Sequence, residues 1–137
     1  MAKQEQLRFT ATEYLSMERA ADLKHEYAFG EIYAMSGASA RHVAIVSNIV
    51  GEIGNQLRQR PYQVYSTDLR LSVDANQRYT YPDVMVVCDK PQFLDKQLDT
   101  LLNPDLLLKC SQSRRGTTTA AISFNNTAAS HLFASIC

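Results

Sequence analysis

The sequence predicts an α+β domain in which a central mixed sheet is flanked by helices. Three observations favour this class. Two segments combine helix caps with helical spacing of apolar residues, one segment alternates polar and apolar residues, and two apolar runs have the length of buried strands. At 137 residues the chain forms one domain that is large enough to bury a core.

The first helix begins after a capping box. Thr10 places a hydroxyl at the N-cap and Glu13 places a carboxylate three residues later, so that each side chain can bond to the backbone N–H of the other residue. The helix is expected to run to about Leu23. Residues 25–35 then predict a β-hairpin, with aromatic residues on its strands and Gly30 near its turn.

The longest helix is expected over residues 40–59. Ser39 can cap its beginning, and Pro61 follows its end. One apolar stripe repeats at helical spacing and consists of Val46, Ile49, Val50, Ile53 and Leu57. This stripe predicts a helix that packs against the sheet.

Three strands are expected after this helix. Residues 63–73 alternate in polarity and predict the first strand. Residues 79–88 predict the second, whose run at 84–87 has the composition of a strand buried on both faces. Residues 89–100 form a charged loop or short helix, and residues 106–108 predict a third buried strand.

The charge balance limits the partners that net charge alone could attract. Acidic and basic side chains number 14 each, which argues against a protein that binds DNA only through a basic surface. A nuclease that approaches phosphates through a bound metal is still compatible with this balance. The first residues contain no apolar signal segment and no stretch is long enough to span a bilayer, so a cytoplasmic location without a membrane partner is expected.

Asp83 is the sharpest candidate for a metal ligand. It enters an apolar strand in the sequence Tyr81-Pro82-Asp83-Val84, where an unpaired carboxylate is costly to bury. Hydrolysis of a phosphodiester with Mg²⁺ uses two or three carboxylates from adjacent elements, because the ion takes hard oxygen ligands. In an arbitrary protein, however, such an aspartate is more often a turn residue at the start of a strand.

His42 and two glutamates are further candidates. His42 lies four residues before Val46, at the beginning of the long helix, where it could carry a proton or contact a phosphate. A packed, hydrogen-bonded histidine is the commoner role for such a residue. Glu26 and Glu31 flank the turn of the hairpin, and charges exposed to solvent are the commoner alternative there.

Several short motifs together carry a resemblance to a known family. They are Glu13-Tyr14-Leu15, His25-Glu26-Tyr27 followed by Gly30-Glu31-Ile32, Ser39 followed by His42, and Tyr81-Pro82-Asp83-Val84. Over about residues 8–108 the chain resembles the restriction-endonuclease-like family that is abundant in cyanobacteria, a branch of the PD-(D/E)xK nuclease superfamily. As a set, and in this order and spacing, the motifs are specific.

The resemblance implies a restriction-endonuclease-like fold and Mg²⁺-dependent cleavage of DNA. Asp83 matches the Pro-Asp acid of the family and would be the metal ligand. Glu26, Glu31 and His42 fall on other characteristic positions, so the resemblance makes these four residues the expected catalytic set. A homo-oligomer is compatible with this assignment.

The chain departs from the family between Leu108 and Lys109. The family continues with E-V-L-S and later motifs, whereas this chain continues with Lys109-Cys110-Ser111 and then loses all periodicity. Restoring one G before the Lys109 codon makes the following codons compatible with those family motifs, in the family's order. We therefore interpret the chain as a frameshifted member, with an incomplete endonuclease-like domain at 1–110 and an aberrant, disordered tail at 111–137.

This interpretation predicts a protein without nuclease activity. The second acid, the lysine of the family's following helix, that helix itself and the last strand are all missing, and one strand acid makes a poor Mg²⁺ site. Two alternatives come from other classes: a non-catalytic module that binds DNA or another partner, and a truncated product without a function. Neutral net charge counts against the first of these.

Overall fold

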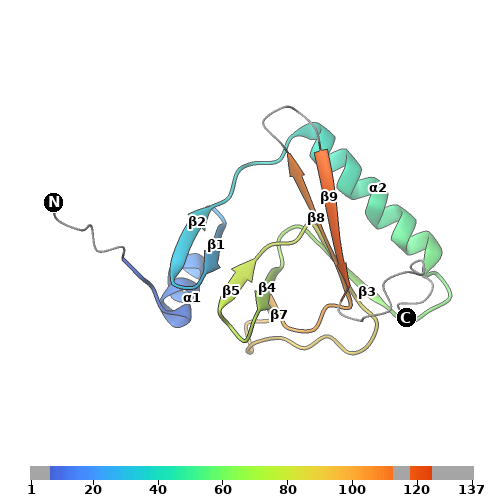
Figure 1. The fold of residues 1–137 in the computed structure, drawn as a ribbon. Coiled ribbons are helices and arrows are strands. Elements are labelled where there is room, and N and C mark those ends of the chain that lie inside the picture. Colours follow the sequence, from blue (N-terminus) through green and yellow to red (C-terminus); the bar gives the residue numbers. More distant parts are fainter. Residues whose placement is uncertain (1–6, 113–117, 125–137) are drawn as a thin grey trace.

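The chain folds into two β-sheets and two helices, an α+β arrangement (Figure 1). The structure is a computed structural model, and it describes residues 7–112 and 118–124. The elements in order are α1 (Ala11–Ala20), β1 (His25–Ala28), β2 (Glu31–Ala34), α2 (Ala40–Gln56), β3 (Gln63–Ser66), β4 (Arg70–Val73), β5 (Arg78–Thr80), β6 (Val84–Val87), β7 (Thr100–Leu101), β8 (Leu106–Gln112) and β9 (Thr118–Phe124).

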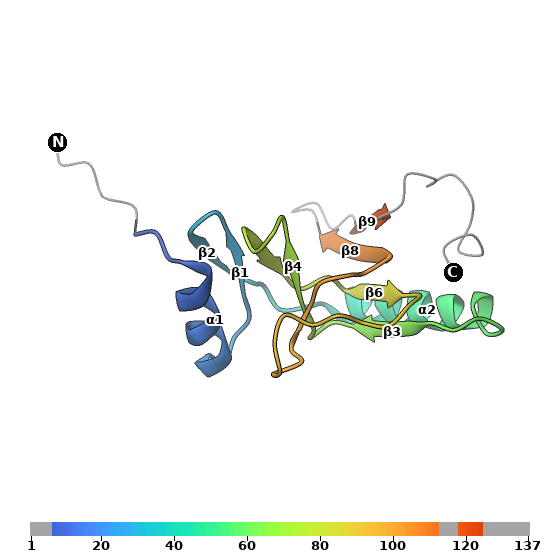
Figure 2. The ribbon, with the colours of Figure 1, turned by 90° about the horizontal axis from the view of Figure 1, so that it is seen from below.

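The first sheet is mixed and has the strand order β2-β1-β5-β4-β7, in which only the β4–β7 pair is parallel. The second sheet has the order β3-β6-β8-β9 and is antiparallel throughout. Helices α1 and α2 lie at opposite ends of the molecule, α1 beside β1 and α2 along the second sheet (Figure 2). The predicted α+β class with a mixed sheet is confirmed.

Local sequence accounts for α1 and the hairpin. The capping box is present, with the Thr10 hydroxyl accepting a bond from Glu13 N at 3.1 Å. The helix ends at Ala20, earlier than Leu23, because Ala21 takes an extended conformation. The hairpin turn consists of Phe29 and Gly30, both with positive φ, which matches the right-handed twist of the two strands.

Helix α2 also begins where the sequence predicts. The Ser39 side chain accepts a hydrogen bond from His42 N at 3.2 Å, and the helix ends at Gln56, close to the predicted end at residue 59. Its predicted stripe faces the second sheet. Val46, Ile53 and Leu57 are buried there, while Ile49 and Val50 are partly buried against the same cluster.

Two predicted strands are each divided between the sheets. The segment 63–73 forms β3 and β4, because Thr67 takes a positive φ of 48° and turns the chain out of the second sheet. The segment 79–88 forms β5 and β6, interrupted around Pro82, which has no N–H to donate to a ladder. The expectation of two continuous strands was wrong. The chain crosses from one sheet to the other at Thr67 and around Pro82, and both crossings lie beside Asp83.

Strand β6 is buried on both faces, as its composition predicts. Val84 and Val86 contact the cluster beneath α2. Met85 and Val87 pack instead with Leu71 of the first sheet. β6, a strand of the second sheet, therefore packs with one face under α2 and with the other face against the first sheet. Within the part of the chain described here, no helix is long and apolar enough to cross a membrane.

The end of the described chain differs from the expected tail. β8 continues to Gln112 and β9 pairs antiparallel with it, from Leu106 opposite Phe124 to Gln112 opposite Thr118. The open edge of β8 and the β-branched residues of the Thr118–Phe124 segment favour this pairing. The remainder of the predicted tail, residues 113–117 and 125–137, lies outside the described residues, and the division of the chain at residue 110 stays a prediction.

Candidate functional site

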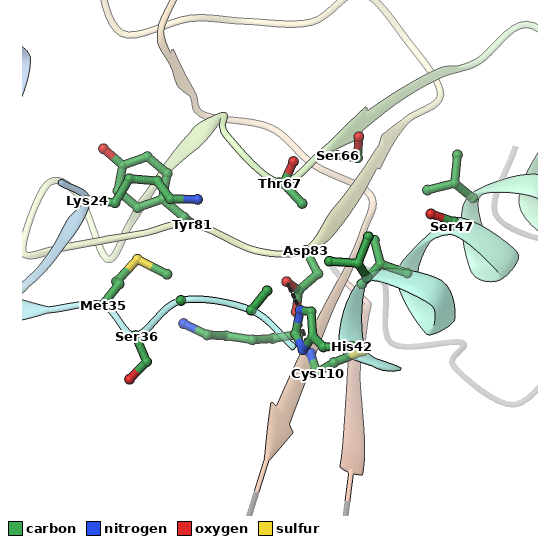
Figure 3. Close-up of a pocket in the computed structure, with 16 residues that line it drawn as sticks. Lys24, Met35, Ser36, His42, Ser47, Ser66, Thr67, Tyr81, Asp83 and Cys110 are labelled. Carbon is green, nitrogen blue, oxygen red and sulfur yellow. Dashed lines mark hydrogen bonds and ion pairs between the residues drawn. The ribbon is translucent and has the colours of Figure 1, made fainter. Parts of the chain in front are cut away.

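A pocket of about 830 Å³ lies between the first half of α2 and the crossing between the two sheets (Figure 3). Its wall includes the segment 35–38 before α2, the end of β3 at Ser66 and Thr67, and Lys109 and Cys110 of β8. Asp83 and His42 both line it. The pocket therefore contains two of the four predicted catalytic residues.

Backbone hydrogen bonds fix Asp83 at the crossing. Asp83 N donates to Leu108 O at 3.0 Å, and Thr67 N donates to Asp83 O at 3.0 Å. Both carboxylate oxygens have protein partners: Oδ1 lies 2.9 Å from His42 Nε2, and Oδ2 accepts a bond from Cys110 N at 2.6 Å. The carboxylate is thus held by one side chain and one backbone amide.

The N-terminal turn of α2 brings His42 to Asp83. The two side chains are each 14% exposed, and their contact spans 41 positions in the sequence. Because an ionised carboxylate only accepts hydrogen bonds, Nε2 carries the proton in this contact. Figure 3 shows the imidazole and the carboxylate pointing toward each other in the wall of the pocket.

Glu26 of β1 pairs with Lys109 of β8, so this ion pair joins the two sheets. The Lys109 ammonium donates to Glu26 Oε1 and, at 3.0 Å, to Thr80 Oγ1, while Thr80 Oγ1 donates to Glu26 Oε1 at 2.6 Å. Burial acts to raise the pKa of Glu26, but the bonds from Lys109 and Thr80 and the charge of Lys109 outweigh it, so this pKa lies below its usual value. Lys109 also lines the pocket, whereas Glu26 does not, so the ion pair connects Glu26 to the pocket.

Glu31 lies apart from the other three predicted residues. It stands at the beginning of β2, opposite Ala28, and its carboxylate accepts a hydrogen bond from the Tyr33 hydroxyl. This bond raises the pKa of Tyr33. Glu31 does not line the pocket, so the expected catalytic set comes together only in part.

A buried polar network anchors the segment that carries Asp83. The Tyr81 hydroxyl donates to Glu18 Oε1 at 2.9 Å and accepts a bond from Arg70 Nε at 3.2 Å. Glu18 also accepts a bond from His25 N at 2.8 Å. Sequence reasoning missed this network, although Glu18 shares a helix face with Tyr14 and Leu15, and a carboxylate on an apolar helix face is a recognisable signal.

The donor set does not fit a Mg²⁺ ion. Asp83 is the one carboxylate among the described residues that line the pocket, and its two oxygens already bind His42 and Cys110 N. The nearby Glu26 carboxylate is occupied by the Lys109 ammonium. Within the described part of the chain, no group of three His, Cys, Asp or Glu side chains is placed to hold a metal.

The Cys110 thiol offers no alternative nucleophile. Burial raises its pKa, and the negative charge of Asp83 raises it further. A thiol is reactive as the thiolate, so both effects disfavour the use of Cys110 as a nucleophile. The chemistry that the pocket does provide consists of lysine ammonium groups, an imidazole and hydroxyl groups.

Comparison with protein families gives one match over most of the chain. The model of the Uma2 family, described as "Putative restriction endonuclease", matches residues 11–109. The match ends at Lys109, the residue at which the sequence predicts the departure from the family pattern.

Two curated relatives come from Synechocystis. One, the uncharacterized protein sll1609, is 37% identical over 98 residues, which are 72% of this chain and 55% of the relative. The other, the uncharacterized protein slr1290, is 39% identical over 77 residues, which are 56% of this chain and 40% of the relative. The chain therefore spans about half the length of the curated relatives that it matches.

One solved structure is similar in fold and sequence. It is the crystal structure from Anabaena variabilis of a protein described as a "putative nuclease belonging to DUF820". The TM-score is 0.50 and the identity 27%, over 58% of this chain and 43% of the other.

Proposed function

Since the chain belongs to the Uma2 family of restriction-endonuclease-like proteins, we propose that its fold derives from a metal-dependent DNA endonuclease and that this copy no longer cleaves DNA. The proposal assigns to the family the hydrolysis of a phosphodiester bond with Mg²⁺. In this chain, according to the proposal, the framework around Asp83 is intact and the metal site is incomplete. The framework includes the His42 contact and the anchored crossing between the sheets.

The Lys109–Glu26 ion pair is the observation that carries this proposal. In the family pattern, the position of Lys109 holds the second acid. An ammonium group there repels a divalent cation and at the same time occupies Glu26, the nearest other carboxylate. Mg²⁺ needs several oxygen ligands placed together, and Asp83 alone does not supply them.

The extent of the family match supports a second proposal, about the reading frame. We propose that residues from Lys109 onward are translated from a shifted frame, because the family match ends at this residue while the chain continues to Cys137. Sequencing the encoding DNA across the Leu108 and Lys109 codons checks this directly. An additional base at that place would show that the natural protein carries the family's second acid.

The first test is a cleavage assay with the purified chain. Supercoiled plasmid DNA is incubated with Mg²⁺ or Mn²⁺, and the Asp83→Asn variant serves as the matched control for contaminating nucleases. We expect the two proteins to give the same background of nicked and linear product. Metal-dependent cleavage by the unmodified chain that disappears in Asp83→Asn would contradict the proposal.

A further inference from the structure

The pocket beside α2 has a cationic lining. Lys24 and Lys109 line it, against the one carboxylate of Asp83. Both oxygens of the Asp83 carboxylate already have hydrogen-bond partners, His42 Nε2 and Cys110 N. The first turn of α2 carries no acidic residue, so no side-chain charge there offsets the positive end of this 17-residue helix.

Both lysines have donors available for a ligand. Lys24 Nζ lies 2.8 Å from Asp68 Oδ1, but the Asp68 side chain is 82% exposed, so water screens this ion pair and a ligand can replace it. Among the described residues, Lys109 Nζ uses two of its three N–H donors for Glu26 and Thr80. In the described part of the chain the third donor has no partner, so it can reach a group in the pocket.

The remaining lining suits an oxyanion with a small organic body. Ser36, Ser47, Ser66 and Thr67 add hydroxyl donors, and Met35, Val43 and Val50 add apolar surface. A volume of about 830 Å³ lies in the range of small-molecule sites. Lysine ammonium groups and hydroxyls are the donors that proteins use for phosphate.

We propose that this pocket binds the phosphoryl group of a small phosphate ester without a metal ion, through the ammonium groups of Lys24 and Lys109 and beside the imidazole of His42. The lysine that prevents Mg²⁺ from binding thus provides the positive charge that a metal would otherwise supply. The inference rests on the proposed function in one respect, since it takes the pocket to be free of metal. If the pocket binds no phosphate, the proposal that this chain does not cleave DNA is unaffected.

The test is a titration followed by NMR in the presence of EDTA. Inorganic phosphate, a deoxynucleoside 5′-monophosphate and the same nucleoside without phosphate are added separately. The readout is the imidazole resonance of His42, which is identified by its loss in the His42→Asn variant. We expect saturable shifts in the millimolar range with both phosphate compounds and none with the nucleoside.

Charge variants locate the site. Lys24→Gln removes a half-exposed lysine of the pocket and should weaken binding roughly tenfold, the loss typical of one charge-assisted hydrogen bond. Lys109→Gln should do the same, and Lys96→Gln, on an exposed loop, should have no effect. Affinity in Lys24→Gln and Lys109→Gln equal to that of the unmodified chain, the absence of a saturable shift, or an equal response to the nucleoside would overturn the proposal.

Discussion

At the scale of single residues, the position of Lys109 decides what the pocket can hold. The side chain joins β8 to Glu26 on β1 and Thr80 on β5, so one ammonium group connects the two sheets. The same contacts neutralise Glu26 and hold an ammonium group in the wall of the pocket that Asp83 also lines. Under the proposed function, this ion pair takes the place of a cation site.

The lowered pKa of Glu26 makes this pair dependent on pH. A carboxyl whose pKa is lower in the folded protein contributes stability above its ordinary value of 4.5 and loses that contribution as pH falls through the folded-state pKa. Lys109→Gln should raise the pKa of Glu26 and lower the free energy of unfolding near neutral pH by about 1 kcal/mol or less, since both groups are partly exposed.

Urea unfolding of both proteins between about pH 3 and pH 7 measures this effect. The difference in stability should be largest at neutral pH and should shrink below the ordinary pKa of a glutamate. Lys96→Gln is the control for loss of a surface lysine. A difference that stays constant across this range would mean that the Glu26 pair contributes nothing.

At the scale of elements, local chemistry specifies the helices and tertiary contacts specify the strands. The caps at Thr10 and Ser39 predict the beginnings of α1 and α2, because each cap satisfies backbone donors within three residues of itself. The divided strands could not be predicted in this way. Thr67 takes its positive φ where its N–H bonds to Asp83 O, a contact between segments far apart in the sequence.

Thr10→Ala tests the contribution of the α1 cap. The substitution removes both hydrogen bonds of the Thr10 hydroxyl, the one from Glu13 N and the one to Glu13 Oε1, and should destabilise the protein by about 1 kcal/mol. Thr12→Ala is the matched control, because Thr12 is exposed in the first turn and alanine is the better helix former, so stability should stay equal or rise by a few tenths of a kcal/mol. Thermal unfolding of the two variants gives the comparison. Equal loss in both would show that the box is not formed.

At the scale of the whole molecule, a metal site requires ligands from several elements to meet at one point. The motifs of the sequence identify Asp83 and His42, and the fold brings these two together from α2 and the crossing before β6. The motifs alone do not reveal the bond between Glu31 and Tyr33, although residues i and i+2 of a strand lie on the same face and the strand period could have indicated it. Nor do they reveal the pairing of Glu26 with Lys109, which depends on how the two sheets meet.

The buried network around Tyr81 belongs to the same scale. Glu18 of α1 and Arg70 of β4 hold the Tyr81 hydroxyl, and Asp83 follows two residues later. The described residues thus hold Asp83 in a fixed framework, and under the proposed function Lys109 stands where the second acid of the family would face it. The chain combines an ordered site framework with a donor set unsuited to Mg²⁺.

The most direct measurement of this claim is a Mn²⁺ titration followed by the paramagnetic broadening of the His42 resonance, because His42 contacts Asp83. Mn²⁺ takes the same oxygen ligands as Mg²⁺. The account predicts no selective broadening in the unmodified chain, and its appearance in Lys109→Glu, which returns an acid to this position. Saturable broadening of His42 in the unmodified chain, abolished by Asp83→Asn, would show that a working metal site persists and would contradict the account.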